Sequence, residues 1–389
     1  MTRRLLVAQV VTRFTAGAGG VALRGALALD PDIYETVFVT GEGDRLVREA
    51  RDAGLEVVLM PRLRSDIAPA DDRRVLADLQ AFVRGFDVVH THSSKAGVLG
   101  RTAAHRTQVG RIVHTFHGFP FHQFQSGLRR AAYIWIERRV GKFTDAFLAV
   151  GPAVAAEAIT RGIAPPERVR TIGIGADTAA PQPGPRERAE ARRLLGAPPG
   201  MRVVGTVGRL TFQKAPDDFV AALAALRRDD VFGVWIGDGE LRAKTERLAA
   251  RHGLRGRMFF AGERSDVAAL LPGLDLFAMA SRYEGLPCAI VEAMTAGLPV
   301  VATAVNAVPN VVVAGETGLL APPGRPELLA RAMEYLLDNP AVAARLAATA
   351  RKRLGEDLTQ SALGEVLAQT YQATPSDASR LAGRELAVS

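Results

Sequence analysis

Short runs of aliphatic and β-branched residues alternate along the chain with polar turns and with segments in which apolar residues recur every three to four positions. This pattern predicts strands buried on both faces and joined by amphipathic helices, which is typical of parallel sheets built from βαβ units. In the first half the expected strands are Leu5–Val11, Thr36–Thr40, Glu56–Met60, Asp87–His92, Arg111–His114 and Ala146–Val150. In the second half they are Val203–Val207, Phe232–Ile236, Met258–Phe260, Leu274–Met279 and Pro299–Thr303.

The rhythm breaks between Gly175 and Pro185, in a segment rich in proline and glycine that indicates a linker. We therefore expect an α/β protein with two doubly wound parallel-sheet domains. The expected boundaries are a first domain at 1–175, a linker and the start of the second domain at 176–200, a second domain at 201–356, a C-terminal helix at 357–373 that packs back toward the first domain, and a frayed tail at 374–389. The carboxyl ends of both sheets would then face a central cleft, where open α/β folds bind ligands.

The composition narrows the class of protein. Of the 389 residues 48% are hydrophobic and 23% charged, which excludes a disordered or collagen-like chain. No apolar run approaches the roughly 18–20 residues that span a bilayer, and Gln9 interrupts the first apolar run, so we expect a buried strand there and not a signal peptide. The single cysteine, Cys288, allows no internal disulfide, and the expected location is the cytoplasm.

The net charge of +8 is concentrated in one segment. Residues 88–142 contain nine lysines and arginines and one acid, Glu137, an excess equal to the charge of the whole chain. A nucleic acid, an anionic membrane surface or a phosphorylated substrate would each explain this segment.

Glycines and histidines follow the first-half strands. Gly19 and Gly20 lie where the first helix opens, so the backbone there suits close approach of an anion, although a plain turn is the alternative and the strict G-x-G-x-x-G fingerprint is absent. Six of the seven histidines fall between His90 and His122. They suggest either a metal site or polar residues lining two strand ends; we favour the second, because no carboxylate lies between Val88 and Leu128 and strand neighbours at i and i+2 share a face only in part of the cluster. Ser93 or Ser94 is expected to cap the following helix.

The second half offers an anion site and a pair of glutamates. Arg209 and Lys214 follow a strand just before a helix, which suits a diphosphate, although two ordinary surface cations are the alternative. Pro287 is expected to be the first helical residue, with Glu284 just before it and Glu292 about 12 Å further along the axis. Glu292 has apolar neighbours, so it needs a partner such as a pair of ribose hydroxyls unless it is a solvated helix residue. Asp30-Pro31-Asp32 lies at the wrong end of the sheet for a metal-dependent sugar site, and Asp71-Asp72 simply starts a helix.

These motifs, in this order, resemble those of the family 4 retaining glycosyltransferases with the GT-B fold. The residues that carry the resemblance are Gly19-Gly20, His90 to Gly97, His114 to Gly118, Gly208 to Leu210 with Gln213-Lys214, Gly237 to Gly239, Glu284 with Glu292, and Gly315 to Leu320. The resemblance covers nearly the whole chain and implies two Rossmann-like domains, the first binding the acceptor and the second a nucleotide sugar.

The resemblance also implies roles for individual residues. Arg209 and Lys214 would hold the pyrophosphate of the donor in place of a metal, and Glu284 with the N–H groups of Gly285 and Leu286 would hold the donor sugar. The remaining donor-side positions are Glu292 at the ribose, Gly19 and Gly20 near the phosphates, and Arg264 near the base. His117 would lie beside the anomeric centre, and His92, Ser94, Lys95 and Phe119 are the candidates on the acceptor side.

The implied reaction is retaining, metal-independent hexosyl transfer from a nucleotide diphosphate sugar, with UDP as the expected nucleotide and with no cofactor and no covalent nucleophile. The Ser-Ser-Lys-Ala-Gly segment resembles the subset that builds bacterial exopolysaccharides, so the expected acceptor is a lipid-linked saccharide and the expected location includes the inner membrane face. Arg129 to Arg139 mixes cations and aromatics as interfacial helices do, although Arg139 shares a stripe with Leu128 and Trp135, and a core-facing helix is the alternative.

Two departures and three alternatives remain. Asn306 and Asn310 stand where the family often has glycine and glutamate, and Ile174 stands where asparagine is usual, which puts the usual shape around the donor sugar in doubt. A GT-B-fold sugar-nucleotide epimerase would need acid–base carboxylates at the sugar, of which only Glu284 is convincing. A small-molecule metabolite is an alternative acceptor. The third alternative is a basic nucleic-acid-binding protein. The sequence lacks the clustered aromatic residues on which such proteins stack bases, so we expect no nucleic-acid partner.

Overall fold

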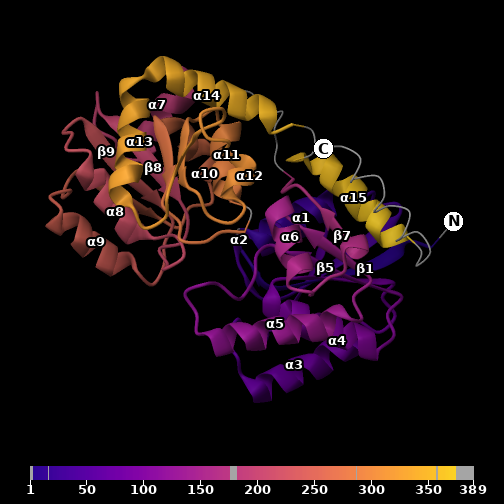
Figure 1. Ribbon diagram of the computed structural model, residues 1–389. Helices are drawn as coiled ribbons and strands as arrows, with labels where there is room; N and C mark the ends of the chain where they lie inside the picture. Colours follow the sequence, from indigo (N-terminus) through magenta and orange to yellow (C-terminus); the bar gives the residue numbers. More distant parts are fainter. Residues whose placement is uncertain (1–2, 16, 176–181, 286, 356–357, 374–389) are drawn as a thin grey trace. The chain divides into compact units, whose positions relative to one another are not determined.

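The structure, a computed structural model, describes residues 3–15, 17–175, 182–285, 287–355 and 358–373 (Figure 1). The chain divides into two compact units, Met1–Gly175 with Asp357–Ser389, and Ala176–Glu356. Each unit contains one parallel sheet covered by helices, as the alternating pattern predicts.

The first unit contains a seven-stranded sheet in the order β3-β2-β1-β4-β5-β6-β7. Its strands are β1 (Leu5–Phe14), β2 (Tyr34–Gly43), β3 (Glu56–Leu59), β4 (Val88–His92), β5 (Arg111–Phe116), β6 (Ala146–Ala149) and β7 (Val169–Thr171). Its helices are α1 (Ala18–Leu27), α2 (Arg45–Asp52), α3 (Pro69–Phe82), α4 (Ser94–Arg106), α5 (Gly127–Gly141), α6 (Pro152–Thr160), the short η1 (Pro166–Arg168) and α15 (Gln360–Gln372).

Helices cover both faces of this sheet. On one face α1 and α2 pack through Leu23, Ala26 and Leu46, and α15 lies against α1 (Figure 1). On the other face α3 and α4 pack through Leu79 and Ala103. The strand order changes direction between β1 and β4, which is the point where open α/β sheets bind ligands beyond the carboxyl ends of their strands.

The second unit contains a six-stranded sheet in the order β10-β9-β8-β11-β12-β13. Its strands are β8 (Arg202–Val207), β9 (Val231–Ile236), β10 (Met258–Gly262), β11 (Leu276–Met279), β12 (Val300–Thr303) and β13 (Leu319–Ala321). Its helices are α7 (Pro185–Leu194), α8 (Pro216–Ala225), α9 (Arg242–Arg251), α10 (Val267–Leu270), η2 (Leu271–Gly273), α11 (Cys288–Thr295), α12 (Val308–Val311), α13 (Pro326–Asp338) and α14 (Pro340–Arg353). The core lies between the sheet and the helices α8, α9, α13 and α14.

All eleven expected strands are present, with ends shifted by a few residues, and two further strands were not expected. The unexpected strands, β7 and β13, are three residues long and lie at the edges of their sheets. Such short edge strands need only half of the usual backbone pairing and leave no apolar run in the sequence.

Candidate functional site

The second unit joins Lys214 and Glu284, which are 70 residues apart in the sequence, in one ion pair. Lys214 follows β8 and Glu284 follows β11, and these strands are neighbours in the parallel sheet, so the segments beyond their carboxyl ends lie side by side. Lys214 Nζ lies 2.6 Å from Glu284 Oε1, and the two side chains are 20% and 4% exposed. The attraction is therefore screened less by water than that of a surface pair.

Further hydrogen bonds fix Glu284. Ser281 Oγ donates to Oε1 at 2.6 Å, and Gln213 Nε2 approaches Oε2 at 3.4 Å. The backbone N–H of Glu284 donates to Oδ1 of Asn306 at 3.0 Å. Asn306 has a φ of 43°, in the left-handed region that asparagine tolerates better than most residues. The departure at Asn306 therefore adds a side-chain bond to the Glu284 loop, and within the described part of the chain Oε2 is the less engaged carboxylate oxygen.

Arg282 connects the two loops that hold Lys214 and Glu284. Its guanidinium donates to the carbonyl of Phe212 at 2.9 Å, lies 4.5 Å from the centre of the Phe212 ring, and pairs with Asp217 at 2.7 Å. Its backbone N–H donates to the carbonyl of Gln213 at 2.8 Å. Burial alone would raise the pKa of Asp217, but Arg282 and the backbone N–H groups of Asp217 and Asp218 together outweigh this effect, so the pKa is lowered.

Glycines allow the backbone to pack closely beneath these loops. A Cβ atom at Gly237 would lie 2.1 Å from the carbonyl oxygen of Gly208, and one at Gly239 would lie 2.6 Å from that of Leu210. A Cβ atom at Gly208 would lie 3.2 Å from the side chain of Lys214. The Gly-Arg-Leu and Gly-Asp-Gly motifs thus form one packed unit that supports Lys214.

The other expected donor residues of this unit differ in their surroundings. Arg209 is exposed and its side chain makes no hydrogen bond or ion pair to a described residue, but its charge opposes the burial that raises the pKa of the Tyr283 phenol. Arg264 is instead occupied, because it pairs with Asp266 through two contacts of 2.7 and 2.6 Å. Glu292 is half-buried on α11.

The expected start of α11 was wrong by one residue. Pro287 occupies the cap position and the helix begins at Cys288. Residues 284, 285 and 287 therefore lie outside the helix, and the separation of about 12 Å that a helical rise predicts between Glu284 and Glu292 does not apply. Gly285 is half-buried beside Glu284, and Leu286 lies outside the described residues.

In the first unit the strand register divides the histidines between the two faces of the sheet. Gln9 of β1 pairs with His90 of β4, and His92 pairs with Thr115 of β5, so these residues share the face covered by α1 and α15. His114 immediately precedes Thr115 in β5, so its side chain points to the opposite face of the sheet, toward α4. Alternation along the strands thus separates side chains that are close in the sequence.

The face beneath α15 holds a chain of polar contacts. His117 Nε2 lies 2.9 Å from His92 Nδ1, and His92 Nε2 lies 2.7 Å from Gln9 Oε1. Gln9 Nε2 donates to the Tyr371 hydroxyl at 2.9 Å, and this hydroxyl lies 2.6 Å from His90 Nδ1. The predicted residue His117 is thereby connected to the C-terminal helix.

Burial keeps these imidazoles uncharged. It lowers the pKa of His90 to about 3 and that of His92 well below its usual value, and the neighbouring histidines lower both further. It also lowers the pKa of half-buried His117 to about 3, with a contribution from Arg24. At neutral pH these rings donate and accept hydrogen bonds without carrying charge.

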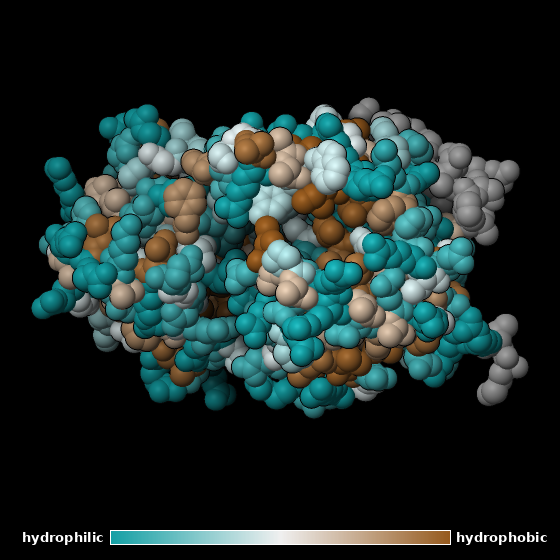
Figure 2. Space-filling model, turned by 90° about the horizontal axis from the view of Figure 1, so that it is seen from below, coloured by the Kyte–Doolittle hydropathy of each residue, from teal (hydrophilic) through white to brown (hydrophobic). Residues whose placement is uncertain are grey.

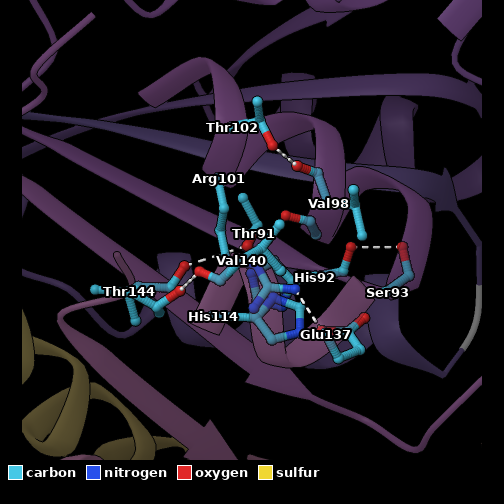
Figure 3. Close-up of polar contacts among 12 residues, drawn as sticks. Thr91, His92, Ser93, Val98, Arg101, Thr102, His114, Glu137, Val140 and Thr144 are labelled. Atoms are coloured by element: carbon cyan, nitrogen blue, oxygen red, sulfur yellow. Dashed lines mark hydrogen bonds and ion pairs between the residues drawn. The ribbon is translucent and has the colours of Figure 1, made fainter. Parts of the chain in front are cut away.

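On the opposite face His114 belongs to a separate polar cluster, shown in Figure 3. Its Nδ1 lies 2.8 Å from Thr91 Oγ1, and a Cβ atom at Gly97 would lie 2.6 Å from its ring. Beside it, Arg101 and Glu137 join α4 to α5 through a contact of 2.6 Å, with side chains 0% and 4% exposed. Burial and the charge of Arg101 lower the pKa of His114.

The acceptor-side candidates do not form one group. Lys95 pairs with Asp72 at 2.6 Å and donates to the carbonyl of Asp66, so Asp72 does more than start α3. Phe119 stacks on Phe121 with ring centres 4.8 Å apart. Ser94 is the first residue of α4 and is half-buried.

Ser93 lies at the expected cap position of α4, but the expectation that its side chain caps the helix was wrong. Ser93 occupies the cap position, but its hydroxyl donates to Thr12 Oγ1 at 2.9 Å. Thr12 of β1 instead accepts from the N–H of Ala96 at 3.0 Å. The hydroxyl that satisfies the start of this helix therefore comes from a neighbouring strand, which local sequence does not reveal.

Gly19 and Gly20 lie inside the first turn of α1, after Gly17 at its cap position. A Cβ atom at Gly20 would lie 3.3 Å from Arg24, whose Nε donates to the carbonyl of Ile174 at 2.8 Å.

Among the described residues no group of three or more His, Cys, Asp or Glu side chains is arranged to hold a metal ion.

Sequence reasoning missed Gln9, Arg24, Arg282 and Tyr371. Gln9 and Tyr371 carried the weak signal of a polar group within an apolar strand or helix face, whereas Arg24 follows Gly20 by one helical turn. Arg282 gave no signal beyond its place beside Glu284.

Comparison with known proteins matches both halves of the chain to family models. Residues 15–180 match "Glycosyltransferase Family 4" and residues 187–353 match "Glycosyl transferases group 1". UDP-Gal:alpha-D-GlcNAc-diphosphoundecaprenol alpha-1,3-galactosyltransferase of Escherichia coli is 31% identical over 263 residues, 66% of this chain and 68% of that protein. D-inositol 3-phosphate glycosyltransferase of Salinispora arenicola is 30% identical over 408 residues, 98% of this chain and 88% of that protein.

The chain is also similar to solved structures. The crystal structure of HepE from Anabaena in complex with UDP and glucose gives a TM-score of 0.84 at 20% identity, covering 94% of this chain and 99% of that one. This likeness confirms the expected fold class, GT-B with two Rossmann-like domains.

Proposed function

Because the chain belongs to glycosyltransferase family 4 and is a glycosyltransferase, we propose that it transfers a sugar from a UDP-linked donor to an acceptor hydroxyl, with retention and without a metal ion. The observation that carries the proposal is the ion pair between Lys214 and Glu284, with exposed Arg209 in the same segment as Lys214, between β8 and α8. The choice of UDP is supported by the complex of HepE with UDP and glucose and by the name of the Escherichia coli relative.

In the proposed reaction the bond between the anomeric carbon and the diphosphate oxygen breaks, and its electron pair leaves with UDP. The acceptor oxygen bonds to the same face of the sugar, and its proton passes to the departing phosphate oxygen. Lys214 has three N–H donors, of which one is given to Glu284 and two remain for phosphate oxygens. Together with Arg209 it would stabilise the charge that develops on the leaving group.

We assign Glu284 to the donor sugar. Its Oε1 already accepts from Lys214 and Ser281, whereas among the described residues Oε2 has only the longer contact to Gln213. A sugar hydroxyl is therefore best placed to donate to Oε2. Glu292, Arg264, Gly19, Gly20 and His117 keep their roles from the family resemblance as predictions. Arg264 would have to exchange part of its pairing with Asp266 to contact a base.

The test is transfer from a panel of UDP-, GDP- and ADP-sugars, run in EDTA, with proton NMR of the product to read the anomeric configuration. We expect turnover with one UDP-sugar, unaffected by EDTA, and a product with the donor's configuration. Inversion, or turnover that needs an added divalent ion, would contradict the proposed mechanism. Lys214→Met serves as the inactive control.

For the acceptor we propose a lipid-linked saccharide reached at an anionic membrane surface on the cytoplasmic side. The stripe of α5 formed by Leu128, Ala132, Trp135 and Arg139 faces outward, with Leu128 84% and Trp135 66% exposed. The core-facing alternative for this stripe was therefore wrong. Figure 2, seen from the side of α3, α4 and α5 in Figure 1, shows apolar groups interspersed with hydrophilic ones. No helix in the described part of the chain is long and apolar enough to cross a bilayer.

This membrane contact is tested by sedimentation with anionic and neutral vesicles. The chain has two tryptophans and Trp235 is buried, so a blue shift of fluorescence on binding would report Trp135. We expect Leu128→Ser with Trp135→Ser to lose binding to anionic vesicles, whereas Tyr335→Ser, an exposed aromatic of the second unit, keeps it. Equal binding by both variants would refute the contact.

A phosphorylated small molecule is the second candidate acceptor. The Salinispora arenicola relative, which matches 98% of this chain, is named for D-inositol 3-phosphate. The basic segment 88–142 suits such an anion as well as a lipid diphosphate. Transfer assays with both kinds of acceptor, each with and without vesicles, decide between them.

A further inference from the structure

The contacts beneath α15 form a chain of hydrogen bonds in which the donors all point the same way along the series. The Gln9 side chain has one accepting end and one donating end, and its Oε1 faces His92 Nε2 at 2.7 Å. His92 must therefore donate from Nε2. A neutral imidazole carries one N–H, so His92 Nδ1 is an acceptor, and the contact of 2.9 Å is donated by His117 Nε2. His117 Nδ1 then keeps its lone pair.

The direction continues on the other side of Gln9. Its Nε2 donates to the Tyr371 hydroxyl at 2.9 Å, and the hydroxyl hydrogen is donated to His90 Nδ1 at 2.6 Å. The remaining N–H of His90, at Nε2, is donated to Thr115 Oγ1 at 2.7 Å. Each hydrogen bond from His117 to Thr115 thus has one donor and one acceptor. Exchanging donor and acceptor in one of these bonds would require the same exchange in all of them.

The surroundings fit a positioning role better than a ligand site. Gln9, His90, His92 and Tyr371 are buried, and the cavity that Gln9, His90 and His92 line has a volume of about 10 Å³, barely enough to admit one water molecule. The charged group that acts on His117 is Arg24, which is held by the carbonyl of Ile174. A positive neighbour and burial both favour the uncharged ring.

We propose that Gln9, His92 and Tyr371 are positioning residues that hold His117 in its uncharged Nε2–H tautomer, so that Nδ1 is a hydrogen-bond acceptor for a substrate hydroxyl. The inference rests on the proposed function, because the tautomer matters to transfer only when His117 contacts the sugar. It also makes α15 a part of the reaction machinery, since Tyr371 of this helix joins Gln9 to His90 in the series of hydrogen bonds.

The direct test is the nitrogen NMR signature of His117 in full-length protein with ring-labelled histidine, assigned by comparison with His117→Asn. We expect a protonated-type signal for Nε2 and an unprotonated-type signal for Nδ1 at neutral pH. A protonated Nδ1, which is the reversed chain, or an equal mixture would overturn the proposal.

Tyr371→Phe removes one hydroxyl and keeps the ring. We expect the His117 signals to become those of a tautomer mixture and kcat to fall about ten-fold, with the donor KM unchanged. Tyr34→Phe is the matched control, because the Tyr34 hydroxyl also bonds α15, through Gln372 at 2.8 Å and Ala368, but lies outside the chain. Equal losses in both variants would mean that α15 is merely loosened, and would refute the positioning role.

Gln9→Glu gives a second route if Tyr371→Phe does not fold. Its carboxylate still accepts from His92 but cannot donate to Tyr371, whose hydroxyl would instead donate to it, so the His117 tautomer should persist while the link to Tyr371 reverses. If the wild-type tautomer is as expected but His117→Ala transfers sugar normally, the catalytic role of His117 fails and the hydrogen-bond chain stands. If transfer depends on His117 but the tautomer is reversed, the chain fails and the proposed function stands.

Discussion

Lys214→Met removes one charge from the proposed donor site and keeps a side chain of similar length. If Lys214 stabilises the leaving diphosphate, its loss raises the barrier by about 3–4 kcal/mol, the cost of losing one preorganised donor, which lowers kcat about 10²–10³-fold. Steady-state transfer assays at saturating donor measure this change.

The same substitution has a structural effect that is separable. Glu284 is 4% exposed and would lose its counter-charge, keeping only Ser281 and Gln213. Because Glu284 keeps these two partners and Lys214 is 20% exposed, the loss costs about 1–3 kcal/mol of unfolding free energy, less than the roughly 3–5 kcal/mol of a fully buried pair. Glu284→Gln in the same chain removes the uncompensated charge, so the double variant should recover stability without recovering activity.

Near-normal turnover by Lys214→Met would refute the leaving-group role. Recovery of activity along with stability in the double variant would show that the loss was structural. An unchanged free energy of unfolding in the single variant would contradict the account of Glu284 as a shielded carboxylate held by Lys214.

Three further outcomes are expected. Glu137→Ala leaves buried Arg101 without its partner and should cost about 3–5 kcal/mol of unfolding free energy in urea titrations, whereas a loss below about 1 kcal/mol would mean that the pair is not shielded. The pKa of His90 is about 3 in the folded protein against an ordinary value of 6.5, so between these pH values the unfolded chain binds more protons than the folded one. The free energy of unfolding should therefore be highest above about pH 6.5 and fall on acidification by up to about 1.4 kcal/mol per pH unit for each such histidine. A free energy of unfolding that is constant from pH 7 to pH 5 would contradict this expectation. Asn306→Gly keeps the left-handed backbone but removes the acceptor for the N–H of Glu284, so donor KM should rise several-fold with little change in Tm, and an unchanged KM would assign Asn306 no role in the donor site.

The strands were predictable because burial on both faces leaves a continuous apolar run in the sequence. β7 and β13 were not predictable from that signal. Val169-Arg170-Thr171 is too short and too polar, and the first two residues of Leu319–Ala321 had been assigned to the Gly315 to Leu320 motif. The start of α11 lies one residue later than expected: proline favours the first helical position, but its fixed φ also fits the cap position that Pro287 occupies.

The candidate site was predictable one residue at a time, but its pairings were not. Lys214 and Glu284 each belonged to a recognisable motif, yet their contact depends on β8 lying next to β11, an order that no local pattern specifies. Tyr371 lies 281 residues from His90 and reads as an ordinary core aromatic of an amphipathic helix. Its function as a hydrogen-bond partner follows only from the packing of α15 against α1 within the first unit.

Thermal unfolding in EDTA with UDP, GDP, ADP and CDP tests the central claim most directly, because a ligand that binds the folded state raises Tm in proportion to its affinity. We predict that UDP raises Tm most, that one UDP-sugar raises it further, and that Lys214→Met abolishes most of the UDP shift. Equal shifts with all four nucleotides, or none with the folded protein, would contradict the assignment of Lys214, Arg209 and Glu284 to a UDP-sugar site.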